Sequence, residues 1–200
     1  ALTPSATGGQ PMQVMYMRRD NIHAGAGTGI VCVKFVAYEL SLCFIYIVLM
    51  CLKGGYYYSY NSQVFWLTIL GFVINLAIVL FIVIIMINKA FILRTGTKWI
   101  NKLSEKSIFK RKIIKDKEKS FESFNRTVSE FTDVIIYIRK NKLRFLGSFI
   151  ISTFNLLLLF AMMYFVYKTM GLSQHGIVDI LALNTFMYMA VSLVPTPGSA

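Results

Sequence analysis

Long apolar runs restrict this chain more than any other feature of its sequence. The first extends from Ile30 to Leu52 and the second from Val64 to Ile87. Each is as long as the ~20 residues that a helix needs to cross a bilayer. Hydrophobic residues make up 56% of the 200 residues and charged residues 15%, against roughly 25% charged in soluble domains. Because a soluble core of this size cannot bury so much apolar surface, the sequence predicts an all-α, polytopic integral membrane protein.

Two later apolar runs predict two further spans, at residues 145–167 and 177–193. Polar stretches at residues 53–63 and 168–176 are predicted to be loops that join the spans in pairs. The first of these contains four tyrosines, which are typical of the membrane interface, where the ring is buried and the hydroxyl is wet. Residues 12–29 contain three glycines and no periodic apolar pattern, so we expect a loop or a short interfacial piece there.

A basic segment at residues 89–144 separates the second predicted span from the third. It holds 16 of the 21 Lys and Arg residues and 6 of the 9 acidic residues, so its net charge is +10. Within it, large apolar residues recur at steps of three and four, as on one face of a helix. These residues are Phe121, Phe124, Val128, Phe131, Ile135 and Ile138.

This pattern predicts an amphipathic helix whose apolar stripe lies against lipid or against the protein's own spans. Nucleic-acid binding would explain the charge but not the Phe/Ile stripe, so we expect none. Because Lys and Arg mark the cytoplasmic side, residues 89–144 are predicted to be cytoplasmic, together with Arg18 and Arg19. The loops at 53–63 and 168–176 then lie outside, as an alternation of four spans requires.

Two stretches rich in proline and glycine, at residues 1–11 and 194–200, flank the spans. Both combine proline with small, uncharged residues, and we interpret them as broken or re-entrant helices at membrane depth. A helix broken in hydrocarbon exposes backbone groups, which survive only where protein or water covers them. The freed N-terminus of a helix also carries roughly half a positive charge and attracts anions.

Paired breaks of this kind point to a transport site between repeats, and structural kinks remain the alternative. Two acidic residues within the predicted spans, Glu39 and Asp179, are expected to face protein or water. The candidate residues of such a site are Pro4, Ser5, Thr7, Gly8, Gly9, Gln10, Glu39, Asp179, Pro195, Pro197, Gly198 and Ser199.

The residues that usually carry catalysis or bind metals form no recognisable set in this sequence. Cys32, Cys43 and Cys51 fall within one apolar run at spacings that match no metal motif, and they read as small hydrophobic residues. His23 and His175 are far apart. The chain has no Gly-x-x-x-x-Gly-Lys loop for a nucleotide. We therefore expect no catalytic residue, metal or cofactor in this segment.

The opening stretch also supports a family resemblance. Residues 3–11, followed by Gln13 and Tyr16, resemble a signature of the lysylphosphatidylglycerol synthase transmembrane family. Residues 194–200 resemble the family's second signature, which normally continues into Gly-Gly and an acidic residue. The resemblance covers essentially all 200 residues. Since the chain begins and ends within these motifs, we expect it to be a piece of a longer protein.

The resemblance implies a bacterial inner-membrane protein that translocates a lipid, either phosphatidylglycerol or lysyl-phosphatidylglycerol, in connection with resistance to cationic antimicrobial peptides. Anionic membrane phospholipids are the implied partners. A second reading makes this segment the membrane anchor of a phosphatidylglycerol lysyltransferase, fused to a cytosolic aminoacyltransferase domain that uses lysyl-tRNA. A third is another small-molecule transporter or a scaffold. A homo-oligomer is compatible with all three.

Overall fold

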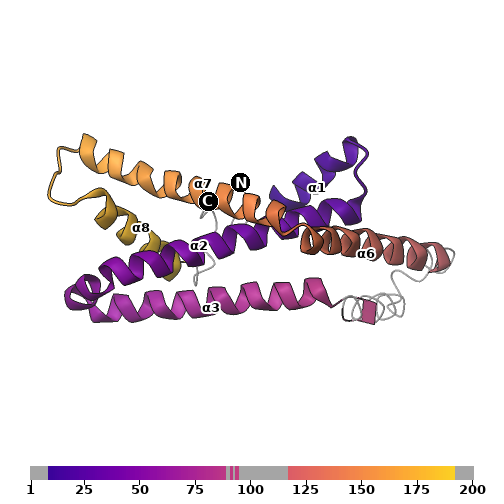
Figure 1. Cartoon of the computed structure of the whole chain (residues 1–200), viewed down its shortest axis with the longest axis horizontal. Coiled ribbons are helices and arrows are strands. Elements are labelled where there is room, and N and C mark those ends of the chain that lie inside the picture. Colours follow the sequence, from indigo (N-terminus) through magenta and orange to yellow (C-terminus); the bar gives the residue numbers. More distant parts are fainter. Residues whose placement is uncertain (1–8, 89–90, 92, 95–116, 192–200) are drawn as a thin grey trace, which may run out of the picture.

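The computed structural model describes residues 9–88, 91, 93–94 and 117–191, and the regular structure in these ranges is entirely helical. The all-α prediction is thus confirmed. The long helices form an elongated bundle in which α2 and α3 lie side by side as an antiparallel pair (Figure 1). The helices are α1 (Gly9–Arg19), α2 (Ala24–Tyr60), α3 (Ser62–Ile87), α6 (Lys117–Lys140), α7 (Lys142–Thr169) and α8 (Ile177–Val191).

Three of the described helices, α2, α3 and α7, are long and apolar enough to cross a membrane. The chain is therefore a membrane protein. The fourth predicted span is seen as α8, whose described part has 15 residues and is about 22 Å long at 1.5 Å per residue. This is shorter than the ~30 Å of hydrocarbon, so the described part of α8 reaches only part of the way along α2 and α3.

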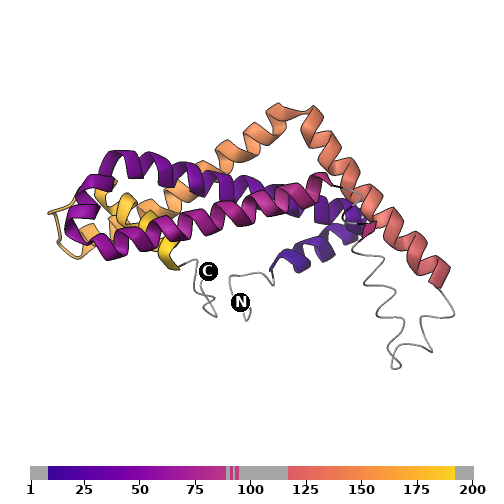
Figure 2. The ribbon, with the colours of Figure 1, turned by 90° about the horizontal axis from the view of Figure 1, so that it is seen from below.

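The helix connections lie at two opposite ends of the bundle. The α2–α3 turn and the α7–α8 loop share one end, while α1 and α6 lie at the other (Figures 1 and 2). Helix α6, which belongs to the basic segment at residues 89–144, and the two predicted outside connections are therefore separated along the long axis, which is the arrangement that alternating spans require.

The predicted loop at residues 53–63 is wrong. Helix α2 continues through this stretch to Tyr60, and only Asn61 separates it from α3. The Asn61 side chain caps α3 by accepting hydrogen bonds from the backbone N–H groups of Gln63 at 3.1 Å and Val64 at 3.2 Å, as an N-cap residue does. Gly54 disfavours a helix by only about 1 kcal/mol, and it is buried against Met50 and Phe65, so packing overrides the local preference.

The predicted loop at residues 12–29 is also wrong, because it is divided between α1 and the start of α2. Pro11 is tolerated in the first turn of α1, where a backbone N–H has no helical partner to lose. Asn21, with φ of 62°, turns the chain between the two helices in the left-handed region that asparagine tolerates.

The glycines of this stretch lie within α2, where their lack of a side chain lets neighbouring helices pack closely against it. A Cβ atom on Gly25 would collide with the carbonyl oxygen of Thr127 in α6, and one on Gly29 would lie 3.0 Å from the Cβ of Val134. Gly27 faces the side chains of α1 instead. The glycine pair four residues apart therefore forms a small-residue face for α6, a device common where helices pack in membranes.

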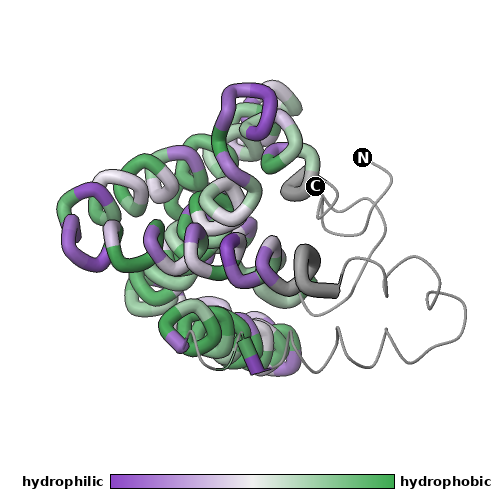
Figure 3. The backbone as a smooth tube through the Cα atoms, turned by 90° about the vertical axis from the view of Figure 1, so that its right-hand side faces the viewer, coloured by the Kyte–Doolittle hydropathy of each residue, from purple (hydrophilic) through white to green (hydrophobic). Residues whose placement is uncertain are grey.

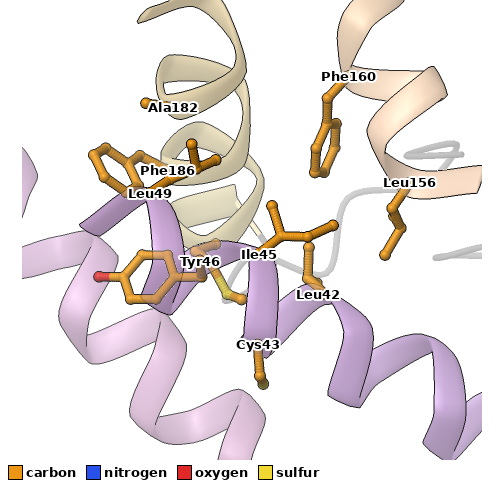
Figure 4. Close-up of a cluster of buried hydrophobic side chains, with 10 residues drawn as sticks. Leu42, Cys43, Ile45, Tyr46, Leu49, Leu156, Phe160, Ala182 and Phe186 are labelled. Atoms are coloured by element: carbon orange, nitrogen blue, oxygen red, sulfur yellow. The ribbon is translucent and has the colours of Figure 1, made fainter. Parts of the chain in front are cut away.

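The main core surrounds the second half of α2, where side chains from α2, α7 and α8 converge (Figure 4). The Tyr46 ring stacks on Phe72 of α3 at a centroid distance of 4.8 Å and meets Phe186 of α8 edge-on at 5.5 Å. Its hydroxyl lies 3.2 Å from the Thr68 hydroxyl. The buried members of this cluster are Leu42, Cys43, Ile45, Tyr46, Leu49, Leu156, Phe160, Ala182, Phe186 and Met189.

The predicted amphipathic helix is confirmed over the described residues as α6. Hydrophilic and hydrophobic residues are interleaved along it (Figure 3). Val128 is buried, and Phe131, Ile135 and Ile138 pack with Val33 of α2 and with residues of α3. The stripe therefore lies against the protein's own spans, which decides between the two alternatives that the sequence left open.

The close approach of α2 and α6 predicts the effect of adding one methyl group. We expect Gly25→Ala to destabilise the protein by about 1–3 kcal/mol, as overpacking typically does, because the methyl group meets the Thr127 carbonyl. Thermal unfolding in detergent measures this. Gly55→Ala, in the same helix but with open space around it, is the control and should be neutral or stabilising. Equal melting temperatures for both variants would contradict the tight contact.

Candidate functional site

A small polar cluster interrupts the apolar interior where α8 meets α2 and α3. At its centre, Glu39 of α2 is half-buried, and its Oε2 atom is buried without a hydrogen-bond partner among the residues that the structure describes. The Asn75 side chain of α3 lies beside the Glu39 carboxyl group. The Asn75 amide nitrogen is also 4.0 Å from the Met189 sulfur of α8. Three helices therefore meet around one carboxyl group.

Two tyrosines extend the cluster beside Glu39. The hydroxyls of Tyr38 on α2 and Tyr188 on α8 are 3.4 Å apart. Helix α8 approaches α3 closely at Gly71, which has no side chain. A Cβ atom at this position would collide with the Met189 carbonyl group of α8. Tyr38 is the chain neighbour of Glu39, and Tyr188 is the chain neighbour of Met189. The contact between the two tyrosines therefore lies at about the same height in the bundle as Glu39.

The electrostatics of the cluster favour a positively charged ligand. In the described part of the chain, no Lys, Arg or His forms an ion pair with Glu39. A carboxylate in a membrane-spanning helix is costly unless it meets a counter-charge, a proton or water. The site can therefore accept an ammonium group or a proton at Glu39, with Asn75 and the tyrosine hydroxyls as neutral hydrogen-bonding groups.

Asp179, the second acidic candidate, lies elsewhere. Its carboxylate is 2.7 Å from the Lys53 ammonium and accepts a hydrogen bond from the Gly176 N–H at 3.1 Å. Lys53, followed by the Gly176 N–H, lowers the pKa of Asp179 below its usual range. Tyr57 donates to the Asp179 carbonyl at 2.9 Å.

These contacts fasten the start of α8 to the end of α2, and a carboxylate in the first turn also suits the helix dipole. Lys53 is 14 residues beyond Glu39, about 21 Å along the helix. The structure therefore does not bring Asp179 and Glu39 together.

The broken-helix motifs are described only in part. Gly9 and Gln10 belong by their backbone to the first turn of α1. Helix α1 starts, and α8 ends, towards the middle of the bundle, and the two come from opposite ends (Figure 2). The other candidates lie outside the described residues: Pro4, Ser5, Thr7, Gly8, Pro195, Pro197, Gly198 and Ser199.

Sequence reasoning missed three members of the cluster, namely Tyr38, Asn75 and Tyr188. Asn75 had a usable signal, because it is an amide within a run that is otherwise apolar. The two tyrosines had none, since tyrosine is common in membrane helices. Lys53 was assigned to a loop, so its ion pair with Asp179 could not be anticipated.

A protein-family model covers the complete chain. The family model described as "Lysylphosphatidylglycerol synthase TM region" matches residues 1–200, which confirms the resemblance. No curated protein and no solved structure matches the chain.

The Lys53–Asp179 pair predicts a pH-dependent effect of Asp179→Asn. Since the pKa of Asp179 is lowered in the folded protein, its stabilising effect is present above the unfolded value of ~3.9 and is lost as the pH falls through the folded pKa. We expect the variant to lose at most about 1 kcal/mol at pH 7, because the pair is partly exposed.

Melting temperatures in detergent between neutral and acidic pH measure this effect, and the gap between wild type and variant should close on acidification. Asp133→Asn, at an exposed position of α6, is the matched control. A gap that stays constant down to pH 3 would show that the charge of Asp179 is irrelevant.

Proposed function

Because this chain belongs to the lysylphosphatidylglycerol synthase transmembrane family, we propose that it moves a phospholipid headgroup between the leaflets of the bacterial inner membrane. The family supports a membrane-associated role in lysylphosphatidylglycerol synthesis or translocation. Of these two, we propose translocation, with phosphatidylglycerol or its lysyl ester as the lipid. Exposure of the cationic lipid on the outer leaflet would then protect the cell from cationic antimicrobial peptides.

The observation that carries this proposal is one Glu39 carboxyl oxygen, buried among the membrane helices, that has no hydrogen-bond partner in the described part of the chain. A lysyl ester carries two ammonium groups, and either could pair with Glu39 while the headgroup crosses. A carboxyl group in a membrane-spanning helix is costly unless it meets a counter-charge, a proton or water, and the ammonium group of a lysyl ester would supply that counter-charge.

The ends of α1 and α8 give further support. The described parts of both helices are shorter than a bilayer crossing, and the described start of α1 and end of α8 lie towards the middle of the bundle (Figure 2). The start of a helix carries a partial positive charge, which at α1 would suit the lipid phosphate. We place α6, which belongs to the basic segment at residues 89–144, on the cytoplasmic side, where Lys and Arg accumulate in membrane proteins.

The test is Glu39→Gln in bacteria that express the full-length protein. We expect the outer-leaflet fraction of lysyl-phosphatidylglycerol to fall roughly tenfold or more, the scale of losing a charged hydrogen bond of about 1.5–3 kcal/mol. A membrane-impermeant amine reagent measures the exposed fraction, and mass spectrometry measures total lysyl-phosphatidylglycerol.

Asp133→Asn, which also removes one negative charge, should leave both values unchanged. Normal exposure in Glu39→Gln at normal protein level would refute translocation through this site. A fall in total lipid with a normal exposed fraction would favour the alternative, in which the segment anchors a lysyltransferase and presents lipid to its catalytic domain.

A further inference from the structure

A groove with a volume of about 400 Å³ lies between α2, α6 and α7. It differs from the Glu39 cluster in its helices, because α6 and α7 line it and α3 does not. Its size is within the ~300–1,000 Å³ range of small-molecule sites. The lining residues are Ile30, Val33, Lys34, Tyr38, Val134, Ile138, Ser148, Ile151, Ser152 and Asn155.

Three polar side chains in this groove have no partner among the described residues. Lys34 is exposed and forms no ion pair with another described residue. Neither Ser152 nor Asn155 forms a side-chain hydrogen bond within the described part of the chain. In helices that cross a membrane, such groups are costly unless they meet water or a polar ligand.

The chemistry of the lining selects an anion that carries an apolar chain. Lys34 supplies positive charge, Ser152 and Asn155 supply neutral donors, and no acidic residue lines the groove. The remaining walls are mostly aliphatic. A phosphodiester on a diacylglycerol has both features, because its phosphate suits the donors and its acyl chains suit Ile30 and Ile151.

The position of Lys34 agrees with this assignment. It lies ten residues from the start of α2, about 15 Å along the helix, at the end of the bundle that carries α6 (Figure 1). A lysine near the end of a span can extend its ammonium group to headgroup level. The groove is therefore placed where a lipid headgroup and the upper acyl chains would lie.

We propose that this groove binds an anionic phospholipid from the surrounding leaflet, with its phosphate at Lys34, Ser152 and Asn155. Tyr38 lines the groove, and its hydroxyl meets Tyr188 of the Glu39 cluster, so a bound lipid lies next to the proposed path. Its role in loading that path rests on the proposed function, whereas binding itself can be measured without transport.

The experiment is photocrosslinking in the full-length protein with Ile151→benzoylphenylalanine. The protein is reconstituted into vesicles in which phosphatidylcholine outnumbers phosphatidylglycerol, and the lipid adducts are identified by mass spectrometry. We expect phosphatidylglycerol adducts to exceed their share of the vesicle lipid several-fold. Lys34→Gln should remove this excess, whereas Lys142→Gln, exposed at the start of α7 outside the groove, should retain it.

Adducts in proportion to vesicle composition would overturn the proposal, as would equal excess in the two lysine variants. Crosslinks to a peptide of the chain itself, in place of lipid, would show that the protein fills its own groove and would also overturn it. A phosphatidylglycerol excess that depends on Lys34, found together with normal lysyl-lipid exposure in Glu39→Gln, would support the groove and reject the proposed translocation. Adducts in proportion to vesicle composition, found together with reduced lysyl-lipid exposure in Glu39→Gln, would reject the groove and leave translocation standing.

Discussion

Helices in a bilayer gain little from hiding apolar surface from one another, because lipid tails are equally apolar, so close packing must hold them together. In this protein that packing centres on α2, which contacts each of the other five helices in the described part of the chain. Gly25 and Gly29 admit α6, and Gly71 of α3 admits the end of α8. If these small residues were larger, α6 and α8 would move outwards, and both the Glu39 cluster and the groove would lose a wall.

The charged residues within the bundle differ in whether they have an ionic partner. Asp179 is paired with Lys53 and fixes the start of α8, whereas Lys34 and Glu39 have no ionic partner among the described residues. The latter two are five residues apart on α2, roughly 140° around the helix. They therefore present opposite charges to different sides of α2. A lysyl-lipid carries the complementary pair, a phosphate and an ammonium, so one headgroup would offer a partner to each.

The two wrong loop predictions have the same physical origin. The loops at residues 12–29 and 53–63 are predicted from local glycine and tyrosine content. Each glycine weakens a helix by about 1 kcal/mol. In the structure, Gly25, Gly29 and Gly54 face other residues of the bundle at close range. Packing contacts therefore outweighed the local preference, and for Gly25 and Gly29 these contacts come from α6, about 100 residues further along the chain.

The sequence by itself determined the helical class, the membrane environment and the apolar stripe of α6. All three follow from residue spacing and from the cost of exposing backbone groups in lipid, which are local properties. Tertiary structure alone decided that the stripe packs against α2 and α3, that Asp179 is neutralised by Lys53, that Asn75 lies beside Glu39, and that Tyr38 meets Tyr188. These arrangements depend on where α8 stops and on how closely the helices approach, and such distances arise only when the whole bundle packs.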